Sequence, residues 1–158
     1  MTNNNKLKNI IDSGDALEQI IKEFEKSYTQ SHRLNIPFKE RIKSVLDGET
    51  YTSFAYTTEL SPNMLYRIKN VVDEKDPPQR KTLMSICVGY QLDLMTTLSL
   101  FDSLGLSFNV HNRRDYAYCF LLTRCRGMDI PECNEVLDAL GIEKHYWLGS
   151  RERSGKVA

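Results

Sequence analysis

The sequence predicts an all-α fold, and two observations carry this prediction. Apolar residues recur at steps of three and four along almost the whole chain, which is the period of amphipathic helices. Glycine or proline interrupts this period at intervals, as expected where helices end or begin. No alternation of polar and apolar residues persists, so we do not expect a sheet, although a single hairpin stays open as an alternative.

The first apolar stripe runs from Leu7 to Tyr28. It predicts one amphipathic helix, or two helices hinged at Asp12, Ser13 and Gly14. Residues 1–36 are therefore expected to form an N-terminal helical arm. Two interpretations of its stripe stay open: it packs on the domain that follows, or it pairs with another chain to form a dimer.

The rest of the chain divides into a domain over residues 37–108 and a C-terminal helical extension with a tail over 109–158. Ser61 followed by Pro62 predicts a helix start, because a hydroxyl can cap the helix and proline suits its first turn. Glycine is expected to end helices at Gly48, Gly105 and Gly127. Helices are expected over about 37–46, 51–58, 62–70, 82–92, 94–104, 113–126 and 131–140, with a loop at 71–79.

Composition excludes several classes of protein. No apolar run approaches the ~20 residues that cross a bilayer, and the polar start lacks the apolar region of a secretory signal. We therefore expect a cytoplasmic protein that does not bind membranes. The four cysteines form no C-x-x-C pair, which predicts buried free thiols and no zinc site.

The sequence also lacks the motifs of common enzymes. It has no G-x-S-x-G, no H-E-x-x-H and no glycine-rich phosphate loop. Cys119 or Cys125 could pair with His111 as a nucleophile, but nothing near them in the sequence supports this, and buried structural cysteine is commoner. We expect no catalytic residue, no metal and no cofactor.

The segment Thr50 to Asn70 carries the clearest motif, TYTSFAYTTELSPNMLYRIKN. It resembles the helix-turn-helix of the Cro/repressor-like (XRE) family without a gap. Thr50 holds the family's first threonine, Phe54-Ala55 its Leu-Ala pair and Leu60-Ser61 its turn, while Leu65 and Ile68 hold the inner positions of the second helix. The resemblance implies a repressor-like domain of about four to five helices, flanked here by N-terminal and C-terminal helical extensions.

The resemblance extends into the C-terminal region. Residues 112–115, Asn-Arg-Arg-Asp, and residues 135–141, EVLDALG, are similar to an extension found in XRE-type proteins of low-GC Gram-positive bacteria. Arg113 and Arg114 could clamp a phosphate. The alternative is structural: Asp115 caps its own helix or forms an ion pair at its start, and the arginines tie that helix to a neighbour.

The resemblance implies binding to double-stranded DNA as a homodimer, with the second helix of the motif in the major groove. Asn63 could read adenine, and Arg67 could reach guanine or a phosphate. The candidate DNA contacts are Thr52, Ser61, Pro62, Asn63, Tyr66, Arg67 and Lys69. The sequence departs from the family at Tyr51, Thr58, Glu59 and Lys69, and a non-glycine at Glu59 must tolerate a strained backbone or a different turn.

Charge leaves two functions open. The chain carries 21 basic and 21 acidic residues, whereas phosphate neutralisation usually supplies much of the affinity for DNA. The first hypothesis is a sequence-specific transcriptional regulator. The alternative is a helix-turn-helix scaffold that no longer binds DNA and contacts a protein partner through the N-terminal helix or the C-terminal extension. A positive surface around residues 61–69 favours the first, and an acidic one favours the second.

Overall fold

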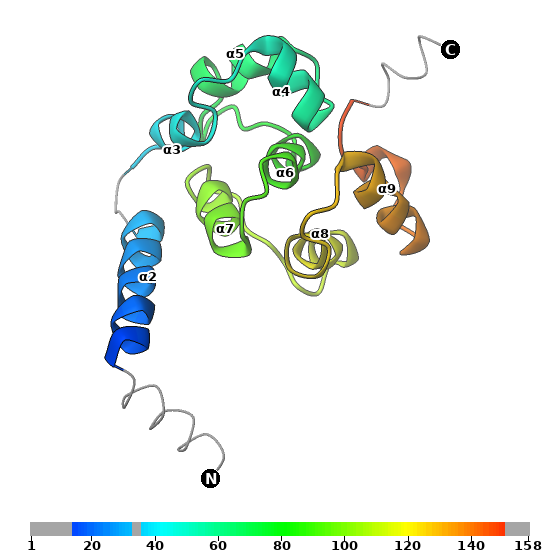
Figure 1. The fold of residues 1–158 in the computed structure, drawn as a ribbon. Coiled ribbons are helices and arrows are strands. Elements are labelled where there is room, and N and C mark those ends of the chain that lie inside the picture. Colours follow the sequence, from blue (N-terminus) through cyan, green and yellow to red (C-terminus); the bar gives the residue numbers. More distant parts are fainter. Residues whose placement is uncertain (1–13, 33–35, 151–158) are drawn as a thin grey trace. The chain divides into compact units, whose positions relative to one another are not determined.

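The computed structural model describes residues 14–32 and 36–150, and every regular element in these two ranges is helical (Figure 1). The predicted all-α fold is therefore confirmed. None of the helices in these ranges has the length and apolar character needed to cross a membrane. In order, the elements are α2 (Gly14–His32), α3 (Phe38–Val45), α4 (Tyr51–Thr58), α5 (Met64–Asn70), α6 (Arg80–Gly89), α7 (Leu94–Asp102), α8 (Arg113–Arg124), α9 (Ile130–Ala139) and the 3-10 helix η1 (Lys144–Tyr146).

The chain forms two compact units, Met1–Asn35 and Ile36–Ala158. In the first, the structure describes the 19-residue helix α2, which agrees with the helical arm that the stripe predicts. The hinge expected at residues 12–14 lies mostly outside the described residues, which begin at Gly14. Four large apolar side chains of this helix are exposed, those of Ile20, Ile21, Phe24 and Tyr28.

Helix α6 forms the centre of the larger unit, Ile36–Ala158. Seven consecutive residues, 82–88, are buried, so this helix is covered on all sides. It contacts α4, α7, α8 and α9, which surround it in Figure 1. The segments expected as a domain (37–108) and as an extension (109–158) thus share one core, because both pack on the same helix.

Most helix ends lie within one to three residues of their predicted places, since the signals are local. Helix α4 has the predicted bounds. Gly141 follows α9 with φ +74°, and Gly127 follows α8 with φ +92°, the left-handed conformation expected of a glycine at a helix end. The region 71–79 contains no helix, as predicted.

The start of α5 differs from the prediction. Ser61 does not cap this helix; Asn63 occupies the cap position in helical conformation and makes no side-chain capping bond. Instead, the N–H of Met64 donates to the carbonyl of Ser61 (3.0 Å), and that of Leu65 donates to the carbonyl of Pro62 (3.1 Å). Residues 61–63 form a tight i→i+3 turn, so α5 begins at Met64 instead of Pro62.

Candidate nucleic-acid interface

The N-terminus of α4 is held by reciprocal hydrogen bonds. The N–H of Ser53 donates to Thr50 Oγ1 (3.1 Å), and the N–H of Thr50 donates to Ser53 Oγ (3.2 Å), which is a capping box. Ser53 Oγ and the hydroxyl of Tyr90 (3.0 Å) both donate to the carboxylate of Glu49. Burial, and then the adjacent Glu49 carboxylate, raise the pKa of Tyr90, so its hydroxyl stays protonated as the donor. These bonds fix the first turn of α4 on α6.

The turn after α4 uses a left-handed residue that is not glycine. Glu59 has φ +55° and ψ +25°, and its N–H donates to the carbonyl of Ala55. The preceding Thr58 is fully buried; its hydroxyl donates to the carbonyl of Phe54 (2.8 Å) and accepts from the N–H of Leu60 (3.2 Å). Thr58 and Glu59 therefore form one hydrogen-bonded turn that needs no glycine.

The chain segment 147–150, which we call the strap, packs against this turn. The N–H of Ser150 donates to the carbonyl of Glu59 (2.8 Å). Gly149 has φ +80°, a conformation that favours glycine, and a Cβ at this position would lie 3.1 Å from Glu59 Cβ. The strap satisfies a carbonyl at the strained position of the turn, which sequence reasoning did not predict.

Two buried side chains hold the strap in place. Asn134 on α9 accepts from the N–H of Leu148 (2.8 Å) and donates to its carbonyl (3.0 Å). Ser85 on α6 accepts from the N–H of Gly149 (2.8 Å). No local signal could have shown these bonds, because the last pair is 64 residues apart in the sequence.

Helix α5 turns one side to the core and the other to solvent. Leu60, Leu65 and Ile68 are buried, whereas Asn63 and Arg67 are exposed. This is the arrangement that the sequence predicts for a helix free to enter a groove. Tyr66 lies on the same outer side, with 57% of its side chain exposed.

The remaining candidate DNA contacts differ in how exposed they are. Thr52 is exposed in the first turn of α4. Ser61, Pro62 and Lys69 are half-buried. The structure therefore brings Asn63, at the N-cap of α5, together with Tyr66 and Arg67 as the accessible residues of this segment.

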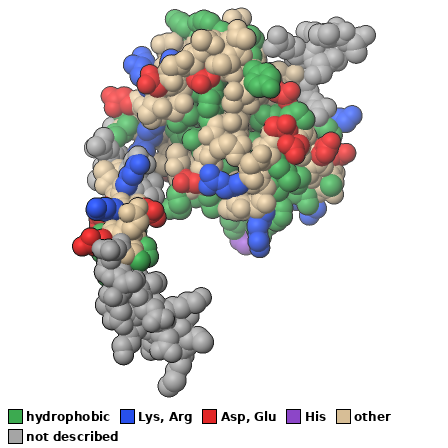
Figure 2. All heavy atoms as spheres, viewed as in Figure 1, with side chains coloured by type: hydrophobic (Ala, Val, Ile, Leu, Met, Phe, Trp, Pro, Cys, Tyr) green, Lys and Arg blue, Asp and Glu red, His purple; other side chains and the backbone are tan. Residues whose placement is uncertain are grey.

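The electrostatic character around α5 is mixed. From 61 to 70 the sequence contains two basic residues, Arg67 and Lys69, and no acidic one. However, Arg67 Nη2 lies 3.9 Å from Asp76 Oδ2, and both side chains are more than half exposed, so water screens this pair. Asp76 belongs to the loop 71–79, where Asp73 Oδ1 accepts from two backbone N–H groups. On the face of the molecule drawn in Figure 2, basic and acidic side chains both occur and no continuous basic surface is seen.

A groove of about 430 Å³ lies beside the C-terminal end of α4, away from the start of this helix. Glu59 and Asp129 line it, and no lysine or arginine does. Its carboxylates would repel a phosphate backbone. We therefore place the candidate nucleic-acid interface on α5 and the start of α4, not in this groove.

Arg113, Arg114 and Asp115 form a structural junction. Arg113 donates to the carbonyl of Leu140 through Nε (3.0 Å) and Nη2 (2.7 Å), which ties α8 to the end of α9. Asp115 is buried; its Oδ1 is 3.2 Å from Arg114 Nη2, and its Oδ2 accepts from the N–H of Asn109 (2.8 Å). These bonds support the structural alternative over a phosphate clamp.

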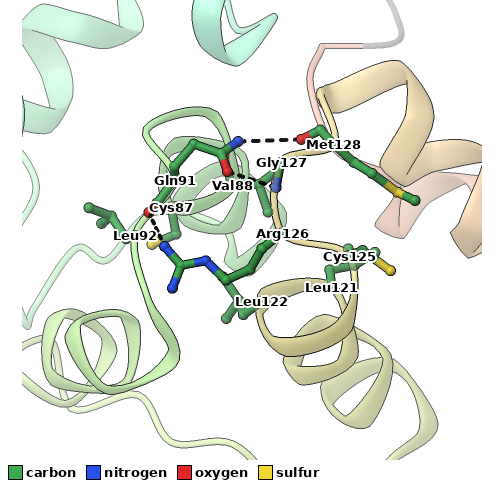
Figure 3. A pocket seen from close by; sticks show the side chains of 10 residues that line it. All are labelled: Cys87, Val88, Gln91, Leu92, Leu121, Leu122, Cys125, Arg126, Gly127 and Met128. Atoms are coloured by element: carbon green, nitrogen blue, oxygen red, sulfur yellow. Dashed lines mark hydrogen bonds between the residues drawn. The ribbon is translucent and has the colours of Figure 1, made fainter.

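Gln91 connects α6 to the turn between α8 and α9 (Figure 3). The N–H of Gly127 donates to Gln91 Oε1 (2.9 Å), and Arg126 Nη2 donates to the backbone carbonyl of Gln91 (3.0 Å). The pocket beneath these bonds has only about 10 Å³ of free space, enough for one water molecule. It is lined by Cys87, Val88, Gln91, Leu92, Leu121, Leu122, Cys125, Arg126, Gly127 and Met128.

The cysteines are free thiols, and all but Cys119 are buried. Burial raises the pKa of Cys87 to about 12 and that of Cys133 to about 12, and it also raises those of Cys119 and Cys125. Such thiols stay protonated at neutral pH and are poor nucleophiles. Among the described residues, no three His, Cys, Asp or Glu side chains are grouped as metal ligands.

Comparison with known proteins assigns no family to this chain. No protein-family model, curated protein or solved structure matches the chain.

Proposed function

We propose that this protein is a sequence-specific DNA-binding transcriptional regulator of the cytoplasm. In this proposal α4 and α5 act as a helix-turn-helix, and the protein binds as a homodimer. One observation carries it: Leu60, Leu65 and Ile68 are buried, so the exposed side of α5 and its N-cap presents Asn63, Tyr66 and Arg67 together. The resemblance of residues 50–70 to the Cro/repressor-like family supports the same function.

These three side chains can form hydrogen bonds with the bases and phosphates of DNA. An amide can bond both polar atoms of an adenine edge, and a guanidinium can bond those of guanine. A tyrosine hydroxyl can donate to a phosphate oxygen. Thr52, exposed in the first turn of α4, supplies a further donor to the backbone. Two copies would read half-sites separated by roughly 34 Å, one turn of the duplex.

The alternative is a scaffold that binds protein and not DNA. The balance of charge favours it, because residues 37–105 carry eight basic and nine acidic residues. The closeness of Asp76 to Arg67 favours it as well, since the carboxylate reduces the positive potential that a phosphate would meet.

Selection from a random duplex library, followed by affinity measurements at two salt concentrations, tests the proposal. The wild type should enrich one sequence, and log K should fall with log salt by about 0.9 for each phosphate contacted. Arg67→Ala and Asn63→Ala should each cost about 1–3 kcal/mol on the selected site. Arg124→Ala is the matched control, since it removes an exposed arginine from α8. A wild type that selects no sequence and shows no salt dependence would refute the regulator and leave the scaffold.

A further inference from the structure

Helix α2 exposes a row of large apolar side chains. Ile20, Ile21 and Phe24 are 47%, 49% and 60% exposed. The ring of Phe24 stacks on that of Tyr28, with centroids 5.8 Å apart and planes inclined by 20°. Contiguous exposed apolar surface of this kind marks a site of association.

The spacing of these residues is that of a coiled coil. Leu17, Ile21, Phe24 and Tyr28 follow one another at steps of four, three and four. Leu7 and Ile10, earlier in the sequence, fall in the same register as Leu17, with Gly14 at the a position between them. Strict alternation of three and four gives a period of 3.5 residues, in which these positions are a and d of a heptad. Ile20 lies at a g position and flanks these residues on one side.

No charged residue of α2 lies at an a or d position. Ile21 and Tyr28 are at a, and Leu17 and Phe24 are at d, so no charge would be buried in a paired seam. The charged residues of α2 outside these positions include Glu18, Lys22, Glu23, Glu25 and Lys26.

We propose that this seam, formed by Leu17, Ile21, Phe24 and Tyr28, binds the same residues of a second copy of the chain as a two-stranded parallel coiled coil. The flanking residues select the parallel direction. Glu18 and Glu25 occupy e positions, and an antiparallel pair sets e against e, which would place Glu18 opposite Glu25 of the second copy twice. A parallel pair sets g against e, so Ile20 packs against the methylene groups of Glu25 of the second copy and no like charges meet.

The parallel direction has a consequence for the rest of the protein. In a parallel pair, both copies of α2 end at His32 at the same end of the coiled coil. Each copy of the larger unit is therefore connected to that end. This pairing does not require DNA binding. The oligomeric state therefore tests it separately from the proposed function.

Light scattering on the full chain measures the self-association. The wild type should have twice the chain mass, and Ile21→Lys/Phe24→Lys should have the mass of a single chain, because two charges enter the seam. Gln19→Lys/Glu23→Gln is the matched control: it adds the same charge on the outer side of α2 and should stay dimeric. A monomeric wild type overturns the proposal, and so does a dimeric seam variant. Unchanged Trp147 fluorescence in the variants shows that the larger unit remains folded.

Disulfide cross-linking tests the direction. Position 21 of one chain faces position 21 of the other only in a parallel pair, so Ile21→Cys should form a cross-linked dimer in a glutathione redox buffer. Gln19→Cys lies on the outer side and should not, and the wild type gives the background from the four native cysteines. A protein that is dimeric by mass but is not cross-linked through position 21 overturns the parallel arrangement.

Discussion

Asn134 supports both backbone groups of Leu148, so we expect Asn134→Ala to lower the free energy of unfolding by about 2–4 kcal/mol. The amide oxygen and nitrogen of Asn134 make bonds of 2.8 and 3.0 Å to the N–H and carbonyl of Leu148, and both residues are buried. Truncation leaves one donor and one acceptor unsatisfied, at about 1–3 kcal/mol each. We take the lower part of the summed range because the neighbouring Ser150 is only half-buried, so the freed backbone groups lie near the surface. The melting temperature should fall by about 4–16 °C.

Urea unfolding followed by tryptophan fluorescence measures this change directly. The chain has one tryptophan, Trp147, which is buried next to Leu148 and donates through Nε1 to the carbonyl of Ile142 (2.8 Å). Asn134→Asp keeps the acceptor for the N–H of Leu148 but loses the donor to its carbonyl, so it too should be destabilised. Glu135→Ala is the control, because Glu135 is exposed on the same helix and should change stability by no more than about 0.5 kcal/mol.

The effect should also reach the turn after α4. When Leu148 is released, the bond from the N–H of Ser150 to the carbonyl of Glu59 loses its support, so the Ser150 amide should exchange with deuterium faster. If Asn134→Ala unfolds at the same urea concentration as Glu135→Ala, Asn134 does not hold the strap. If the variant is destabilised while Ser150 exchanges as in the wild type, the strap and the turn are not coupled.

Three further predictions concern the core and its junctions. Gly89→Ala should destabilise the larger unit by about 1–3 kcal/mol in urea, because the new Cβ would lie 2.7 Å from the backbone oxygen of Thr57; the stabilisation expected of alanine in an unconstrained helix would contradict this close approach. Stability should fall as pH rises from about 9 towards 12, because the unfolded chain loses thiol protons near the ordinary pKa of 9.0 while burial holds the pKa of Cys87 and Cys133 at about 12. Each thiol contributes up to about 1.4 kcal/mol per pH unit in that window, so Cys87→Ala/Cys133→Ala should flatten the slope, and an unchanged slope would argue against both raised values. Arg113→Ala should cost about 0.5–1.5 kcal/mol in thermal unfolding, since it removes two hydrogen bonds to the end of α9, whereas no loss would mean that solvent replaces them.

Much of the fold is predictable from sequence because its signals act over a few residues. The helix over 51–58 was expected and is observed with the same bounds. Gly127 and Gly141 end helices by adopting positive φ, which glycine adopts without a steric cost. The inward positions of Leu60, Leu65 and Ile68 follow from the helical period, and the structure places all three in the core. The accessible residues of the candidate interface, Asn63 and Arg67, follow from the same period.

Other features depend on which segments meet in space. Helix α5 begins at Met64 and not at the predicted Pro62, because residues 61–63 form a tight turn. The capping preference of Ser61 does not predict this turn. The ion pair of Arg67 with Asp76 depends on the path of a loop.

By itself, the sequence determined that the described parts of this chain are helical, where most helices end and which side of α5 faces the core, since these depend on neighbours three or four positions away. Only the tertiary structure decided how the left-handed turn at Glu59 is completed, because the N–H of Ser150, which donates to the carbonyl of Glu59 (2.8 Å), comes from a segment distant in the sequence.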